Sequence, residues 1–95
     1  MTTKGIIGFL KTFQGVLKME MKDGRVSFFD GWCKSRISIN LKKKQIEYWT
    51  TPEGETELKK QRDVSVYDIA TMRFTPWRKE LTLYGSDGVL AVWKV

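Results

Sequence analysis

Apolar and polar residues alternate along most of this chain, the pattern typical of half-buried β-strands. Between residues 9 and 22, one of the two alternating sets is mostly apolar. Its members are Phe9, Phe13, Gly15, Leu17, Met19 and Met21. The alternation favours a strand conformation, either as two strands or as one strand bent at Gly15.

A short helix is the competing interpretation of the N-terminal segment. It would begin at Thr3, stop at Gly15 and present an apolar face made of Ile6, Ile7, Leu10 and Phe13. Gly5 and Gly8 lie inside this helix, and each would weaken it by about 1 kcal/mol relative to alanine. We therefore favour strand over helix for residues 3–14.

Asp23-Gly24 is the strongest turn signal in the chain. Asp-Gly suits a two-residue type I′ turn, because both central positions of that turn need a positive φ. A turn at this place pairs Lys22 with Arg25, Met21 with Val26, and Met19 with Phe28. Apolar residues then lie opposite apolar residues on one face, as a half-buried hairpin requires.

A second hairpin is predicted over residues 36–49, where aliphatic and polar residues again alternate. A turn at Lys43-Lys44 would pair Leu41 with Ile46 and Ile39 with Tyr48. Lysine is a poor residue for a type I′ turn, so a four-residue loop is the alternative.

The rest of the chain predicts further short strands. Residues 55–63 form a polar segment, which predicts a charged edge strand. Residues 69–74 are predicted to form another strand. A loop follows at residues 75–79, and residues 81–84 and 89–95 form a final hairpin across residues 85–88. The expected fold is all-β, one domain over residues 1–95: a small antiparallel meander of about seven strands, closed as a barrel or as a two-layer sandwich.

The amino-acid composition excludes several kinds of catalytic and metal site. The 95 residues include no histidine and one cysteine, so nucleophiles activated by histidine, metal sites ligated by histidine and an internal disulfide are all excluded. We expect no enzyme activity, no metal and no cofactor, and we expect a reducing, cytoplasmic location. The net charge is +6, and residues 1–44 contain ten basic but only three acidic residues. Such a surface favours a polyanionic or acidic partner.

If the two hairpins pair side by side, the face opposite the core combines basic and aromatic side chains. The predicted nucleic-acid-binding residues are Lys18, Lys22, Arg25, Phe29, Arg36, Lys42, Lys43, Lys44 and Trp49. Cations contact phosphates, and aromatic rings stack on bases in proteins that bind single strands. The plainer alternative is a solvated basic face, with Phe29 and Trp49 in a second small core.

A protein-binding module, such as a virus- or plasmid-encoded modulator that docks on an acidic host protein, is the second functional hypothesis. Its anchors would be Trp32, Trp77 and Arg78 in predicted loops, with the exposed strand edge at residues 55–63. An exposed edge also leaves room for a homodimer. Membrane attachment is not expected, because it would need the N-terminal helix to insert Ile6, Ile7, Phe9 and Leu10 into lipid beside Lys42–Lys44.

Overall fold

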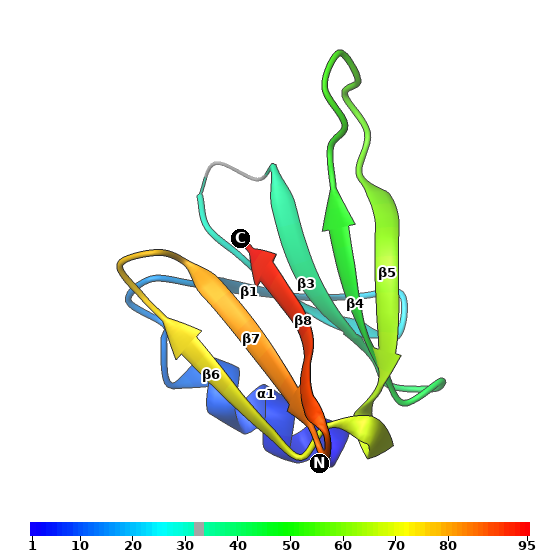
Figure 1. Cartoon of the computed structure of the whole chain (residues 1–95). Coiled ribbons are helices and arrows are strands. Elements are labelled where there is room, and N and C mark those ends of the chain that lie inside the picture. The colour runs from blue at the N-terminus through cyan, green and yellow to red at the C-terminus, as the bar shows by residue number, and fades with distance from the viewer. Residues whose placement is uncertain (32–33) are drawn as a thin grey trace.

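The structure is a computed structural model that describes residues 1–31 and 34–95, so Trp32 and Cys33 lie outside the described residues. Its elements in chain order are α1 (Thr3–Lys11), β1 (Lys18–Lys22), β2 (Arg25–Phe29), β3 (Ser35–Asn40), β4 (Gln45–Thr50), β5 (Lys59–Ser65), the short 3-10 helix η1 (Val66–Asp68), β6 (Thr71–Thr75), β7 (Glu80–Gly85) and β8 (Gly88–Lys94). The strands form two antiparallel sheets, ordered β1-β2-β3-β4-β5 and β6-β7-β8, which face each other (Figure 1). The all-β sandwich is therefore confirmed, while the sheets do not close into a barrel. The described residues contain eight strands, one more than we expected.

The hydrophobic core lies between the two sheets. The five-stranded sheet contributes Val26, Phe28, Ile37, Ile39, Ile46 and Val64, and the three-stranded sheet contributes Met72, Phe74, Leu81, Leu83, Ala91 and Trp93. Across the layers, the rings of Tyr48 and Trp93 stack in parallel with their centroids 5.3 Å apart. The side of the five-stranded sheet that points into this core is called its inner face below, and the opposite side its outer face.

The N-terminal segment is a helix, so our preference for strand over residues 3–14 was wrong. The Thr2 hydroxyl caps α1 by accepting a hydrogen bond from the backbone N–H of Gly5 at 3.0 Å. Ile6 and Leu10 are fully buried in the core, and burying an aliphatic side chain contributes about 1.5–3 kcal/mol. That gain outweighs the weakening caused by the two glycines. The helix ends at Lys11, before the predicted stop at Gly15.

The Asp23-Gly24 hairpin has the predicted register. Asp23 and Gly24 both have positive φ values, 54° and 74°. The pairs Lys22–Arg25, Met21–Val26 and Met19–Phe28 all form. Val26 and Phe28 are buried, yet the two methionines opposite them stay exposed.

The β3–β4 hairpin has the four-residue alternative loop, and this corrects the predicted pairs. Ile39 lies opposite Ile46, and Ile37 lies opposite Tyr48, so Leu41–Ile46 and Ile39–Tyr48 were wrong. The loop is held at Asn40, whose side-chain oxygen accepts from the N–H of Lys43 at 3.0 Å. The shift of two residues leaves each side chain on its predicted face, because strand residues alternate with a period of two.

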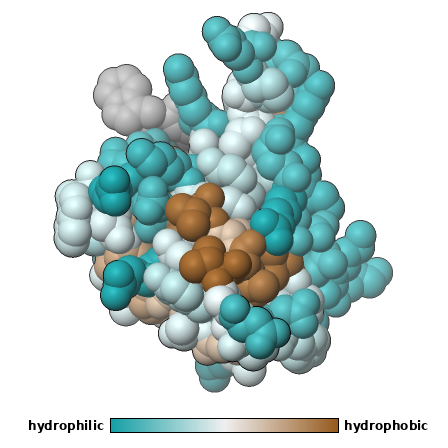
Figure 2. Space-filling view, viewed as in Figure 1, coloured by the Kyte–Doolittle hydropathy of each residue, from teal (hydrophilic) through white to brown (hydrophobic). Residues whose placement is uncertain are grey.

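The remaining strands follow the sequence prediction in order, although β5 begins at Lys59, so residues 55–58 of the predicted edge strand are not part of it. β5 is an edge strand whose first five residues are exposed, and β7 and β8 form a hairpin in which Gly85 pairs with Gly88. Val89 and Val92 on β8 are exposed, and Figure 2 shows a hydrophobic patch at the centre of the face viewed there. Over residues 1–31 and 34–95, no helix has the length and apolar character needed to cross a membrane. Since Ile6 and Leu10 are used in the core, they are also unavailable for insertion into lipid.

The helix predicts unequal responses to alanine substitution at its two glycines. An added Cβ at Gly8 meets no atom within 4 Å, whereas at Gly5 it would lie 3.1 Å from the capping hydroxyl of Thr2. Gly8→Ala should therefore raise the free energy of unfolding by about 0.5–1 kcal/mol, measured by urea denaturation. Gly5→Ala is the matched control and should gain less, because the methyl group crowds the cap. An equal gain from both substitutions would contradict this account of the helix.

Candidate nucleic-acid interface

The outer face of the five-stranded sheet brings together the basic and aromatic residues singled out from the sequence. Lys18 lies opposite Phe29 and Lys22 opposite Arg25 in the β1–β2 pair, and Arg36 lies opposite Trp49 in the β3–β4 pair. Residues directly opposite in a sheet share a face. In the β2–β3 pair, the buried Phe28 lies opposite the buried Ile37, so the neighbouring Phe29 and Arg36 point to the other face. The six strand residues of the predicted site are therefore on one surface, and Phe29 and Trp49 are half-buried there rather than sealed in the core.

A buried carboxylate lies at the centre of this face. The Glu47 side chain has no exposed surface, although it points away from the hydrophobic core. Arg25 reaches it with Nε at 2.7 Å and Nη2 at 3.3 Å. The indole Nε1 of Trp49 donates to it at 3.1 Å, and the amide of Asn40 at 3.4 Å. Glu47 thus fixes the positions of one cation and one ring of the candidate site.

These contacts decide the ionisation of Glu47. Burial alone would raise the pKa of this carboxyl, but the hydrogen bonds from Arg25, Trp49 and Asn40 outweigh burial and hold the pKa below its ordinary value of 4.5. The hydrogen bond to Glu47 is also the main cause that raises the pKa of Arg25. Both groups are therefore charged at neutral pH, and the charge of Arg25 is largely compensated within the protein.

Arginine side chains also lie on the aromatic rings of this face. The Arg36 guanidinium is 4.5 Å from the ring centroid of Phe29, and that of Arg25 is 5.7 Å from Trp49. Arg36 also donates to Glu20 at 3.0 Å. Both arginines are consequently ordered by an acid and a ring.

Besides Lys60, which lies opposite Trp49 and pairs with Asp63, five lysines border the outer face. Lys18 and Lys22 on β1 and Lys42, Lys43 and Lys44 in the β3–β4 loop are all exposed. The N–H of Leu41 donates to the carbonyl of Gly24 at 3.1 Å, which holds the β1–β2 and β3–β4 turns side by side. Lys22 and the three loop lysines therefore lie at the same end of the sheet, where they form a concentrated positive surface.

The residues of the protein-binding hypothesis lie elsewhere. Trp77 and Arg78 are in the β6–β7 turn of the smaller sheet, and Trp77 is 85% exposed. Lys79 in this turn bonds Asp30 at 2.8 Å, which connects the turn to the segment after β2. Trp32, the third predicted anchor, falls outside the described residues.

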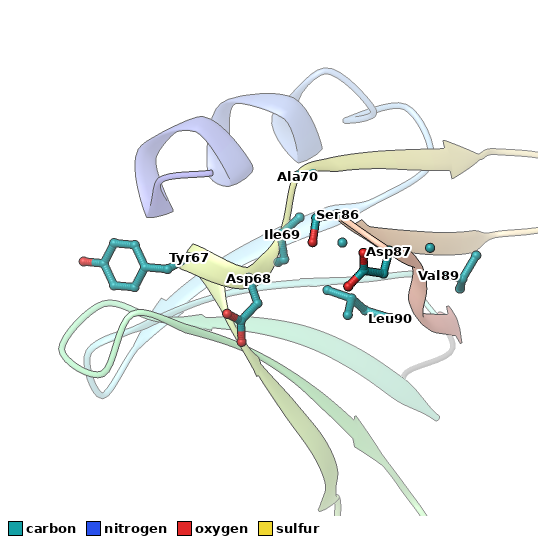
Figure 3. Close-up of a pocket in the computed structure, with 10 residues that line it drawn as sticks. Tyr67, Asp68, Ile69, Ala70, Ser86, Asp87, Val89 and Leu90 are labelled. Atoms are coloured by element: carbon teal, nitrogen blue, oxygen red, sulfur yellow. The ribbon is translucent and has the colours of Figure 1, made fainter.

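A separate hollow of about 490 Å³ lies between η1 and the β7–β8 turn. Figure 3 shows the Asp87 carboxylate pointing into this space while the Tyr67 ring points away from it. Asp68 is the second carboxylate of its lining. Within the described ranges, no group of three or more histidine, cysteine or carboxylate side chains is placed to hold a metal.

Comparison with known proteins adds no assignment, since no family model, no curated protein and no solved structure matches this chain. The geometry of the outer face is therefore the evidence on which a function can be argued.

Sequence reasoning missed Glu47 and Asn40. Alternation along β4 places Glu47 on the same side as Trp49, where a glutamate is expected to be solvated. Its burial depends on Arg25, which is 22 positions away in the sequence, and on Trp49 folding over it. The only sequence signal is the predicted arrangement of the hairpins, which would have placed Arg25 and Glu47 on one face.

The Glu47 network predicts a specific sensitivity to acid. Because the folded pKa of Glu47 lies below its unfolded value, its stabilising effect is complete above about pH 4.5 and is lost as the pH falls through the folded pKa. Glu47→Gln should lower the free energy of unfolding at pH 7 by about 1–3 kcal/mol. It should also lose less stability than the wild type between pH 6 and pH 3, roughly the range over which carboxyls protonate. Urea denaturation across that range measures both effects.

Glu20→Gln is the matched control, since it removes the partly exposed carboxylate that Arg36 contacts. Its effect at pH 7 should stay below about 1 kcal/mol. Equal acid sensitivity of the wild type and Glu47→Gln would show that Glu47 is not the stabilising carboxylate.

Proposed function

We propose that this protein is a non-catalytic nucleic-acid-binding module that binds a single strand across the outer face of its five-stranded sheet. The observation that carries the proposal is the common surface of Lys18, Lys22, Arg25, Phe29, Arg36 and Trp49, bordered by Lys42, Lys43 and Lys44. Cations for phosphates and rings for bases therefore occur at neighbouring positions.

The lysines supply the phosphate contacts in this proposal. Within residues 1–31 and 34–95, Lys18, Lys22 and the loop lysines form no ion pair. Uncompensated lysines on a protein of net charge +6 attract a polyanion over a distance of about 10 Å at 0.1 M salt. Arg25 and Arg36, which already bond acids, would mainly keep the aromatic rings in place.

A single strand fits this surface better than a duplex. The described part of the chain offers one α-helix, and the buried side chains of α1 hold it against the core, so it is unavailable to enter a major groove. A sheet with half-buried rings accepts unstacked bases instead, with weak sequence preference. With one cysteine and no histidine in the sequence, the proposal places the protein in the cytoplasm, without a cofactor.

The exposure of Trp77 supports a second candidate function. A tryptophan that is 85% exposed in a short turn, next to the exposed Arg78, has the character of an interface anchor. In this alternative, the β6–β7 turn docks on an acidic protein, as a virus- or plasmid-encoded modulator of a host protein would. We rank it second because it relies on fewer converging side chains.

The three loop lysines should set the salt dependence of binding. Affinity for a fluorescein-labelled oligo-dT or oligo-U strand should fall steeply between 50 and 200 mM salt, a range over which several phosphate contacts cost about 10-fold or more. Lys42→Gln/Lys43→Gln/Lys44→Gln should weaken binding and reduce the slope of log K against log salt by up to about 2, since each lost contact removes about 0.7.

Lys4→Gln/Arg73→Gln/Lys94→Gln removes the same charge at exposed positions away from the outer face and should change the slope much less. An equal effect of the two triple variants would mean that net charge, and not this face, attracts the strand. Absence of binding to both strands at low salt would remove the nucleic-acid proposal and leave the Trp77 surface as the candidate.

Trp49 should contribute stacking. Trp49→Ala should weaken binding of the oligo-dT strand by at least about 1 kcal/mol at low salt, because base–aromatic stacking contributes about 1–3 kcal/mol. Trp49→Phe is the control, since it also removes the N–H that bonds Glu47 but keeps a ring. If both variants lose the same affinity, the hydrogen bond to Glu47 matters rather than stacking. Circular dichroism checks that each variant is folded.

A further inference from the structure

Strand β1 forms one edge of the five-stranded sheet and is the least covered strand of the fold. All five of its residues are exposed, and among the strands of the described residues β2 is its one neighbour. Met19 and Met21 point toward the inner face, since they lie opposite the buried Phe28 and Val26. They nevertheless remain 45% and 69% exposed. The second layer therefore ends before it reaches β1.

The backbone of β1 is free to pair on this side. In a two-residue hairpin, the residues that flank the turn form a hydrogen-bonded pair, and such pairs alternate with non-hydrogen-bonded ones. Lys22–Arg25 is that closing pair, so Met21–Val26 and Met19–Phe28 are non-hydrogen-bonded pairs. The N–H and C=O groups of both methionines consequently point away from β2, in the geometry of an acceptor edge for one more strand.

Two of the other edge strands, β5 and β8, are protected. β5 exposes a run of charged and polar residues along its edge. The pairing of β8 with β7 shifts register next to Leu83 and Tyr84 of β7, and the Lys94 carbonyl of β8 accepts a hydrogen bond from the Tyr48 hydroxyl. Bulges, charges and covering side chains are the usual means of blocking an edge. β1 carries charges at Lys18, Glu20 and Lys22, and these charges restrict which strand can pair with it.

The charge pattern of β1 decides which partner fits. The order of charges along β1 is the same from either end: positive, neutral, negative, neutral, positive, in Lys18-Met19-Glu20-Met21-Lys22. Pairing with β1 of a second copy, in full register and in either orientation, would place lysine opposite lysine and glutamate opposite glutamate. Like charges directly opposite each other are destabilising. Full-register pairing with a second copy of this chain is therefore disfavoured at this edge.

We propose that the free edge of β1 binds an extended segment of an acidic partner protein, with acidic residues opposite Lys18 and Lys22 and apolar residues opposite Met19 and Met21. Glu20 already contacts Arg36, so the central position of the segment is basic or neutral. A cavity of about 100 Å³ opens beside β1 between Leu10, Leu17, Met19 and Phe28. It offers space for an aliphatic side chain of the added strand. This proposal does not depend on nucleic-acid binding.

Two synthetic peptides test the charge pattern on the full chain by NMR titration. The first contains Glu-Val-Lys-Val-Glu and the second Lys-Val-Glu-Val-Lys, both between Gly-Ser linkers. The first should bind at least about tenfold more tightly, because like charges oppose the second. Lys18→Glu/Lys22→Glu should reverse that preference. Equal binding of the two peptides, or no shift of β1 resonances at millimolar peptide, would overturn the proposal.

Two further measurements test strand addition itself. Hydrogen exchange at the Met19 and Met21 amides should slow when the first peptide binds, while the Glu20 amide, paired with Ser27, should not change. Met21→Pro removes one outward N–H without breaking the β1–β2 ladder. It should weaken binding of the first peptide at least about tenfold relative to Met21→Ala. Equal affinity of these two variants contradicts strand addition. Dimerisation of the wild type that Met21→Pro abolishes would show that the occupant is a second copy instead.

Discussion

The structure depends on one constraint: a three-stranded sheet and a nine-residue helix must cover the inner face of a five-stranded sheet. The smaller sheet packs over the centre, where Tyr48 stacks on Trp93 across the layers. α1 adds Ile6 and Leu10 to the core, and Phe13 just after it packs on Phe74 with ring centroids 4.7 Å apart. This cover ends before β1. Three strands are too few to cover a sheet of five, so the helix is needed to complete the core. The methionines of β1 lie beyond this cover and stay exposed.

The outer face has no second layer, and its own side chains cover it instead. Glu47 is buried by Arg25 and Trp49, which fold over it from neighbouring positions, and the hydroxyls of Ser27 and Ser38 bond each other at 2.7 Å beside it. A buried charge is tolerated only when it is paired and hydrogen-bonded. Satisfying Glu47 therefore orders a guanidinium and an indole at the surface. A preordered ring and cation lose less conformational entropy when a ligand binds, and this connects the stability of the face to its proposed use.

The features that local chemistry determines could be predicted from the sequence. Asp23-Gly24 fixed the register of the first hairpin, because a two-residue turn leaves no freedom in pairing. The four-residue loop at Leu41–Lys44 allowed more than one register, so the pairs of the second hairpin were displaced while the faces stayed correct. The helix was missed because its stability comes from burying Ile6 and Leu10, which outweighs the local effect of two glycines. Glu47 was missed because three residues that surround it, Arg25, Asn40 and Trp49, come from three different strands.

The two proposed ligands share Lys18 and Lys22, which point to the outer face and also flank the free edge of β1. An acidic strand on β1 would neutralise both lysines and bring additional negative charge to that side of the face. The loop lysines are held at one end of the sheet by the Leu41–Gly24 hydrogen bond and would keep their charge. Because exposed charges are screened beyond about 10 Å at 0.1 M salt, the repulsion would act on the part of a nucleic acid strand near β1. An acidic partner would therefore shorten the stretch of nucleic acid that contacts the outer face, without abolishing its binding. By linkage, bound nucleic acid would weaken the binding of the partner to the same degree.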